Sequence, residues 1–185
     1  MKTYKELKSL FLVANKTFLR DEKDLFSSEV SERCLCGSLM LHLNRQILKH
    51  KKYEGYYTDV EYNRNRGNIK TIKKTVKGAN EQIISVTCDL IIHSRGNHPE
   101  QDNLIALEMK KSNSRLAEKK KDRERLMALT KDTFDDVWSY DGITLPEHVC
   151  GYVVGIYYEI NFESKEIYIE YYKQGEYVEM EIIKY

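Results

Sequence analysis

The sequence predicts an α/β (α+β) fold in which a mixed central β-sheet is flanked by helices. Three observations support this prediction: apolar residues recur at helical spacing near the start, later segments alternate polar and apolar residues, and a charged helical segment divides those later segments into two groups. The 185 residues are enough for one domain spanning 1–185 with a substantial buried core.

The first part of the chain is expected to form two helices. One is predicted over 4–19, within an N-terminal helical region 1–25. The other is predicted to begin after Ser27 and Ser28, which are good N-cap residues, and to end near Lys49. Apolar residues recur at every fourth position in it, so it should bury one stripe. They are Leu35, Leu39, Leu43 and Ile47.

Three strands are expected to follow as a meander. They are predicted over 56–63, 83–93 and 104–110, and a basic loop or hairpin is predicted between Gly67 and Gly78. In the second strand, period two would place alternate side chains on opposite faces of the sheet. One face would carry Ile84, Val86, Cys88, Leu90 and Ile92, and the other Asp89, Ile91 and His93.

The rest of the chain is expected to form a helix and three more strands. The helix is predicted over 115–130 and the strands over 149–158, 166–172 and 177–183, the last two as a hairpin. Tyrosine is concentrated here, since residues 140–185 carry nine of the fourteen tyrosines. These side chains could cover a half-exposed sheet. The alternative is a homodimer through the C-terminal strands, because tyrosine is enriched in protein interfaces.

The composition excludes several classes of protein. No stretch approaches the roughly 18 uncharged apolar residues that a membrane span needs, and the N-terminus lacks the small-residue cleavage site of a signal peptide. We therefore expect a cytoplasmic protein without a membrane partner. The four cysteines lack the spacing of a zinc site, so free and mostly buried thiols are expected. They are Cys34, Cys36, Cys88 and Cys150.

The charges are unevenly distributed, although the net charge is only +1. Residues 64–77 include basic side chains and no acidic one, and basic side chains also dominate residues 110–131. Each run could be a solvated face, but two runs that flank one candidate site favour a phosphate-bearing partner. The nucleic-acid contacts expected from them are Arg64, Arg66, Lys70, Lys73, Lys74, Lys111 and Arg115.

The stretch NLIALEMKKS places a carboxylate and an ammonium group at the end of an apolar strand. The chain holds four copies of Glu-x-Lys, and only Glu108 and Lys110 close such a strand. Period two places both side chains on one face. Asp89 belongs to the preceding strand, so a hairpin of the two strands would bring its carboxylate beside that of Glu108 near the mouth of the hairpin.

Two adjacent carboxylates repel each other unless something neutralises them. Mg²⁺ would do so, because it prefers a few carboxylates together with water and phosphate oxygens. Lys110 could then hold a water molecule and offset the charge of a phosphate. A partly exposed salt bridge at the strand end explains the same residues equally well. Asp122, on the later helix, is expected to cap that helix or to pair within it.

The segments TCDLIIHSRG and NLIALEMKKS together resemble the core of the PD-(D/E)XK nuclease superfamily, which has the restriction-endonuclease-like fold. More narrowly, the chain resembles a branch of small bacterial and phage proteins. The segments SERCLCGSLMLHL, VEYNR and DRERL match the pattern of that branch in the same order. The similarity spans roughly 31–126, and Cys88 stands where the pattern has a proline.

The resemblance implies a restriction-endonuclease-like core and hydrolysis of phosphodiester bonds that depends on Mg²⁺ (or Mn²⁺), with DNA as the expected substrate. Asp89 and Glu108 would be metal ligands, and the carbonyl of Met109 would be a third. Lys110 would be the catalytic lysine. Glu32 resembles an acidic residue that several branches add to the catalytic site.

Two further positions are suggested by the same resemblance. Glu61 and His93 correspond to polar positions that could line the cleft, although a role of His93 in the turn is an equal alternative. Three classes of function remain: a metal-dependent nuclease, a catalytically inactive nucleic-acid-binding or protein-interaction module of the same fold, and an interaction protein that uses its Tyr-rich sheet. The complete set of Asp89, Glu108 and Lys110 favours the nuclease.

Overall fold

The computed structural model describes residues 1–62, 64–65, 68–69, 71–75, 81–85, 88–132 and 150–185, with side chains described for 1–62, 88–132 and 150–185. The helices are α1 (Tyr4–Asp21), α2 (Lys23–Ser27), α3 (Glu32–Leu48) and α4 (Leu116–Leu129), and the 3-10 helices are η1 (Lys51–Tyr53) and η2 (Pro99–Gln101). The strands are β1 (Tyr57–Val60), β2 (Arg64–Asn65), β3 (Asn68–Ile69), β4 (Thr71–Thr75), β5 (Glu81–Ser85), β6 (Leu90–His93), β7 (Asn103–Lys111), β8 (Val154–Asn161), β9 (Glu166–Lys173) and β10 (Glu176–Lys184).

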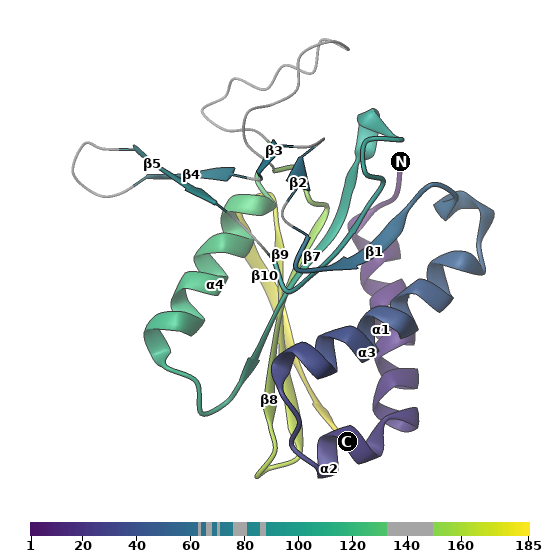
Figure 1. Ribbon diagram of the computed structural model, residues 1–185, viewed down its shortest axis with the longest axis vertical. Coiled ribbons are helices and arrows are strands. Elements are labelled where there is room, and N and C mark those ends of the chain that lie inside the picture. Colours follow the sequence, from purple (N-terminus) through teal and green to yellow (C-terminus); the bar gives the residue numbers. More distant parts are fainter. Residues whose placement is uncertain (63, 66–67, 70, 76–80, 86–87, 133–149) are drawn as a thin grey trace.

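A six-stranded mixed sheet lies between helices on its two faces (Figure 1). Its strand order is β1-β6-β7-β8-β9-β10, in which β7 and β8 are parallel and the other neighbouring pairs are antiparallel. The parallel pair is joined through the segment that contains α4, as a crossover requires. The predicted fold class, a mixed central sheet flanked by helices, is confirmed.

The helices α1 and α3 cover one face of the sheet. α1 begins at Tyr4 as predicted, but α3 begins later than predicted, because Ser31 is its N-cap. The hydroxyl of Ser31 accepts a hydrogen bond from the backbone N–H of Cys34 at 3.3 Å. Ser27, which the sequence suggested as a cap, instead ends the short helix α2. Several serines could cap a helix here, and the sequence alone does not rank them.

The alternation predicted for β7 is confirmed. Ile105, Leu107 and Met109 belong to the apolar core under α1 and α3. Ala106 belongs to a second core on the opposite face, where Leu126 of α4 packs. Gly155 of β8 permits the close approach of α4, since a Cβ atom there would lie 2.9 Å from the Cγ2 atom of Thr130.

The single strand predicted over 83–93 is wrong. β5 pairs with β4 outside the main sheet, and β6 starts at Leu90 inside it. Cys88 packs with Ile91 in the core under α4, whereas Leu90 packs in the core on the other face. The alternation therefore changes by one residue at Asp89, which lies in a bend. The apolar pattern runs through both segments, so it conceals this break.

The C-terminal strands differ from expectation in their burial. β8 starts at Val154, later than predicted, and the predicted hairpin of β9 and β10 is confirmed. The described tyrosines are mostly buried and do not cover a half-exposed sheet, because helices cover both faces of β8 and β9. Their hydroxyls are satisfied by polar partners inside the protein, as buried tyrosines require. The pairs are Tyr157 with Glu159, Tyr158 with Asn15, Tyr171 with Glu181, and Tyr172 with Glu170.

Candidate active site

Lys110 lies where the end of β7 meets both α3 and α4. Its Nζ atom is 3.2 Å from Asp122 Oδ2 on α4 and 3.5 Å from Glu32 Oε2 on α3. Glu32 also accepts hydrogen bonds from the backbone N–H of Lys111 at 2.8 Å and from Ser114 Oγ at 3.3 Å. Carboxylates therefore tie the end of β7 to a helix on each face of the sheet, and the ammonium group of Lys110 lies between them.

Glu108 faces α4 and is almost completely buried, with 1% of its surface exposed. Its Oε1 atom accepts a hydrogen bond from Arg125 Nη1 at 2.6 Å, and the same nitrogen is 3.2 Å from Asp122 Oδ1. Burial raises the pKa of Glu108 to about 8, although Arg125 opposes this shift. Near neutral pH this carboxyl group therefore binds a proton more readily than an ordinary glutamate.

Asp89 lies just before β6, outside the ladder that β6 forms with β7. The last described pair of that ladder is Leu90 with Leu107. Beyond it, Asp89 Oδ2 accepts a hydrogen bond from the backbone N–H of Met109 at 2.8 Å, so a carboxylate replaces the missing backbone acceptor. Burial raises the pKa of Asp89, while this hydrogen bond and Lys110 act in the opposite direction.

Asp89 and Glu108 have different direct partners but share one electrostatic environment. Glu108 contacts Arg125 on α4, and Asp89 contacts the backbone of Met109. The charge of Asp89 nevertheless contributes to the raised pKa of Glu108. Lys110 interacts with Asp89 and, through an ion pair, with Asp122. Asp89 and Glu108 therefore lie close enough for their charges to interact, and their sharing of one cation stays a prediction.

Four carboxylates and two cations gather at this end of β7. The carboxylate cluster comprises Glu32, Asp89, Glu108 and Asp122, and its cations are Lys110 and Arg125. If every group were ionised, the cluster would hold two more negative than positive charges. Buried Asp122 Oδ2 has Lys110 Nζ as its charged neighbour at 3.2 Å. The excess of carboxylates over cations indicates a site that is short of positive charge.

An open pocket of about 560 Å³ adjoins the cluster. Its lining residues come from α3, β1 and the ends of β6 and β7: Ser31, Glu32, Arg33, Cys36, Val60, Glu61, Asp89 and Lys111. Glu61 therefore lines the same pocket as Asp89, as the sequence suggested. Its carboxylate pairs with Arg33 at 2.7 Å, and its backbone N–H donates to the carbonyl of Asp89 at 3.2 Å. Glu61 thus supports the backbone of Asp89.

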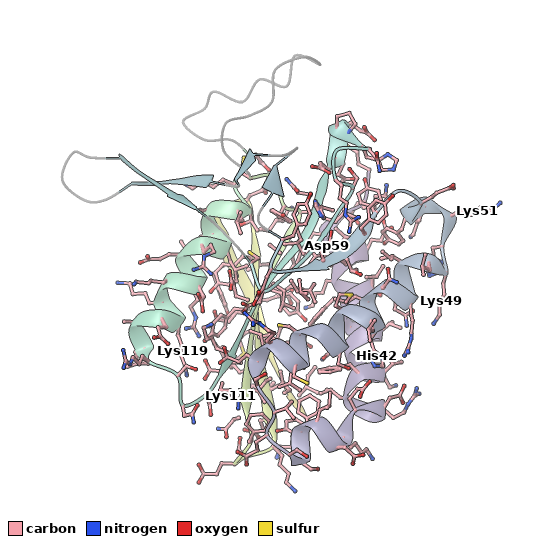
Figure 2. The ribbon with its side chains drawn as sticks, viewed as in Figure 1. His42, Lys49, Lys51, Asp59, Lys111 and Lys119 are labelled. Atoms are coloured by element: carbon pink, nitrogen blue, oxygen red, sulfur yellow. The ribbon has the colours of Figure 1, made fainter. Side chains whose placement is uncertain are left out.

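His93 does not line this pocket. It lies at the other end of β6 from Asp89, with only 2% of its surface exposed. Its Nε2 atom is 2.9 Å from Asp59 Oδ2, and Asp59 is also paired with Arg95. Figure 2 separates Asp59 clearly from Lys111, which marks the end of β7. The structure therefore supports the alternative that His93 stabilises the strand end and its turn.

A ready-made set of metal ligands is absent from the described side chains, where no group of three or more His, Cys, Asp or Glu is arranged to hold an ion. The predicted set of ligands contains only two carboxylates. Such a set is compatible with Mg²⁺, because this ion keeps several of its water ligands. The set joins Asp89 and Glu108 to the carbonyl of Met109, whose N–H already contacts Asp89. The four cysteines are free, and all but Cys34 are buried, as expected. The shortage of positive charge is the feature that fits a divalent cation.

The predicted phosphate contacts are described only in part. Arg64, Arg66, Lys70, Lys73 and Lys74 lie outside the residues whose side chains are described. Lys111 donates from Nζ to the carbonyl of Glu29 at 2.9 Å and lies over the ring of Phe162, so its ammonium group is partly engaged. Arg115, Lys120 and Lys121 of the α4 region are exposed. Lys120 Nζ lies 3.9 Å from Glu124 on the same helix, and all three side chains remain at the surface, where a polyanion can reach them.

Asp122 and Arg125 complete the site, although sequence reasoning gave neither a role in it. Asp122 pairs with Arg125 within its helix, as expected, and also reaches Lys110. The segment DRERL contains both residues and matched the family pattern, so that match was the available signal. Their contacts with β7 depend on how α4 crosses the sheet, which the spacing of residues within α4 does not reveal.

Removing Arg125 should destabilise the protein in a pH-dependent way. The folded state raises the pKa of Glu108, so the contribution of this group to stability falls as the pH rises toward about 8. Arg125 limits that fall. We expect Arg125→Met to lower the free energy of unfolding by about 3 kcal/mol above pH 8, and by much less at pH 5, where Glu108 is protonated.

Chemical denaturation at both pH values measures this difference. Arg115→Met is the matched control, because Arg115 is exposed and precedes the same helix. Equal losses of stability at pH 5 and above pH 8 would contradict the assignment of Arg125 as the counterion of Glu108.

Comparison with known proteins assigns no family: no family model matches the sequence, and no curated protein or solved structure matches it significantly. Within the described part of the chain, no helix has both the length and the apolar character that crossing a membrane requires.

Proposed function

We propose that this chain is a phosphodiester hydrolase dependent on Mg²⁺ (or Mn²⁺), a nuclease of the PD-(D/E)XK superfamily that acts on DNA in the cytoplasm. One observation carries the proposal: Lys110 is held between carboxylates of two helices, beside Asp89 and buried Glu108, in a cluster with too few positive charges. A salt bridge at a strand end needs only two charged side chains, whereas this cluster contains four carboxylates and two cations.

The residues that would hold the cation are Asp89 and Glu108, with the carbonyl of Met109. When bound, a divalent cation supplies an activated water molecule and offsets the negative charge of the phosphate. The residues present fit such an ion, because the cluster has an excess of carboxylates and burial raises the pKa of both Asp89 and Glu108. Glu32 and Asp122 would remain the partners that orient Lys110.

Lys110 is suited to stabilise charge and not to accept a proton. Burial acts to lower its pKa, but Asp122, Asp89 and Glu32 outweigh burial and raise the pKa to about 12. The ammonium group is therefore protonated at neutral pH. It can donate a hydrogen bond to a phosphate oxygen or hold the attacking water, and its two carboxylate partners restrict its position.

The exposed basic residues near α4 would bind the phosphate backbone. Arg115, Lys120 and Lys121 are exposed, and contacts of this kind position a nucleic acid without reading its bases. We therefore propose binding that depends strongly on salt and little on sequence.

The second candidate is a catalytically inactive module that binds nucleic acid or a protein through the same fold. One observation favours it: Glu108 already has Arg125 as its counterion, and Asp89 already accepts from the Met109 N–H. Both acids are thus partly satisfied by the protein. In this case nucleic acid would bind, but no cation would be taken up and no strand would be cut.

Incubation with plasmid DNA, single-stranded DNA and RNA in Mg²⁺ or Mn²⁺ separates the two candidates. The nuclease proposal predicts cutting of DNA by the wild type and loss of cutting in Asp89→Ala and Lys110→Ala. Binding of DNA without cutting, unchanged in both variants, would favour the inactive module and reject the nuclease.

A further inference from the structure

Two cationic side chains are among the described residues that line the open pocket beside the carboxylate cluster, Arg33 of α3 and Lys111 of β7. Lys111 is already engaged, because its Nζ atom donates to the carbonyl of Glu29 at 2.9 Å and lies 5.2 Å from the centre of the Phe162 ring. Arg33 differs, since 79% of its side chain is exposed. Of these two cations, Arg33 is therefore the one that a ligand entering the pocket can reach.

The guanidinium group of Arg33 is held by one contact within the described part of the chain, with the carboxylate of Glu61. Its Nε atom donates to Glu61 Oε1 at 2.8 Å, and its Nη2 atom lies 2.7 Å from the same oxygen. A guanidinium group has five N–H donors, so this contact leaves those of Nη1 for another acceptor. The Glu61 side chain is itself 47% exposed, and ion pairs between exposed side chains contribute little to stability. An incoming anion can therefore displace Glu61 at small cost.

Only side chains need to move in such an exchange. Arg33 belongs to the first turn of α3, where the N-cap Ser31 accepts a hydrogen bond from the backbone N–H of Cys34 at 3.3 Å. Glu61 follows β1, and its backbone N–H donates to the carbonyl of Asp89 at 3.2 Å. Both backbones are thus held by hydrogen bonds that do not involve the pair of Arg33 and Glu61.

We propose that Arg33 binds a phosphate group of the DNA backbone, and that it exchanges Glu61 for this phosphate when the nucleic acid enters the pocket. The inference rests on the proposed function, because Arg33 shares the pocket with Asp89, a predicted ligand of the cation. The phosphate at Arg33 therefore belongs to the strand that passes the cation site. A planar guanidinium group suits this role, since it can bind two phosphate oxygens at once.

The charges of the pocket explain why Glu61 holds Arg33 in the free protein. The lining contains three carboxylates, of Glu32, Glu61 and Asp89, so Arg33 lies in a negative environment. A phosphate must compete with Glu61 for Arg33, and the carboxylate of Glu61 therefore weakens DNA binding. Removal of the Arg33 charge should then weaken binding, whereas removal of the Glu61 charge should strengthen it. A salt bridge with only a structural role predicts effects of the same sign, because either change breaks the same contact.

Fluorescence anisotropy of a short labelled DNA duplex, added to the full chain in EDTA, tests the phosphate contact without strand cutting. Arg33→Met should raise the dissociation constant by roughly tenfold, because a hydrogen-bonded contact between charged groups is lost. The dependence of log K on log salt concentration should become shallower by about one. Arg20→Met is the matched control, since Arg20 is 69% exposed and pairs with Asp21 at 2.6 Å but does not line the pocket. Equal binding by Arg33→Met and Arg20→Met would overturn the proposal.

The same titration with Glu61→Gln tests the exchange. This variant should lower the dissociation constant by roughly threefold, which corresponds to the release of an exposed ion pair. Asp21→Asn is its control, because this change removes the same charge from the matched pair and should leave the dissociation constant close to that of the wild type. Weaker binding by both Arg33→Met and Glu61→Gln would show that the pair is structural and would reject the exchange.

These measurements separate this inference from the nuclease proposal, since they require no hydrolysis. If the wild type binds DNA through Arg33 but cuts none in Mg²⁺ or Mn²⁺, the nuclease proposal fails and the phosphate contact stands. If the wild type cuts DNA, and Arg33→Met binds and cuts it equally well, only the phosphate contact is rejected. A wild type that binds no DNA contradicts both.

Discussion

Asp89→Asn is expected to abolish DNA hydrolysis and to weaken Mn²⁺ binding by at least about a hundredfold. Removing a residue that only orients a metal ligand already weakens metal binding by roughly 10- to 100-fold, and removing the ligand itself should weaken it more. The amide retains the shape of the side chain and can still accept the hydrogen bond from the Met109 N–H, so the backbone geometry should be preserved. The change therefore removes the charge of Asp89 and little else.

Stability provides the control for this prediction. Burial raises the pKa of Asp89, so the folded state disfavours its charged form. Asp89→Asn should then unfold at the same or a higher denaturant concentration than the wild type. A variant that loses both stability and Mn²⁺ binding would indicate a structural role, and one that keeps Mn²⁺ binding would contradict the assignment of Asp89 as a ligand.

Lys110→Met should separate catalysis from metal binding. We expect the rate of hydrolysis to fall by roughly a hundredfold to a thousandfold, because the ammonium group is the donor placed to stabilise charge on the phosphate. Mn²⁺ should bind at least as tightly as in the wild type, since the substitution removes a positive charge from beside Asp89 and Asp122. The methionine retains most of the apolar stem.

Single-turnover cleavage and Mn²⁺ titration of the same samples test this separation. Lys165→Met is the matched control, because Lys165 belongs to another Glu-x-Lys copy and is exposed in the turn between β8 and β9. Loss of Mn²⁺ binding in Lys110→Met, or unchanged cleavage, would show that Lys110 has a structural role.

The sequence predicted the parts of the fold that depend on local periodicity. The alternation around Glu108 was correct because both faces of β7 are covered, which fixes each side chain to one core. The alternation around Asp89 was wrong, because the chain bends there and Cys88 changes faces. An apolar pattern records which residues are buried but not where the backbone leaves the ladder.

The sequence also predicted only part of the candidate site. Glu32 and Lys110 were identified from the sequence, and the structure brings them within 3.5 Å. The roles of Asp122 and Arg125 were missed, because their partners lie on β7 and the contact depends on the path of α4 across the sheet. The burial of the C-terminal tyrosines was missed for a similar reason: a tyrosine ring accepts either environment when its hydroxyl finds a partner.

Proton release during Mn²⁺ binding tests the central claim most directly. Burial raises the pKa of Glu108 to about 8, so the metal-free protein should hold a proton on this carboxyl group at pH 7, and a bound cation should expel it. Calorimetric titration in buffers of different ionisation enthalpy should reveal the release of about one proton at pH 7, none well above pH 8, and none in Glu108→Gln. The absence of Mn²⁺ binding, or binding at pH 7 without proton release, would contradict a cation site built on Asp89 and Glu108.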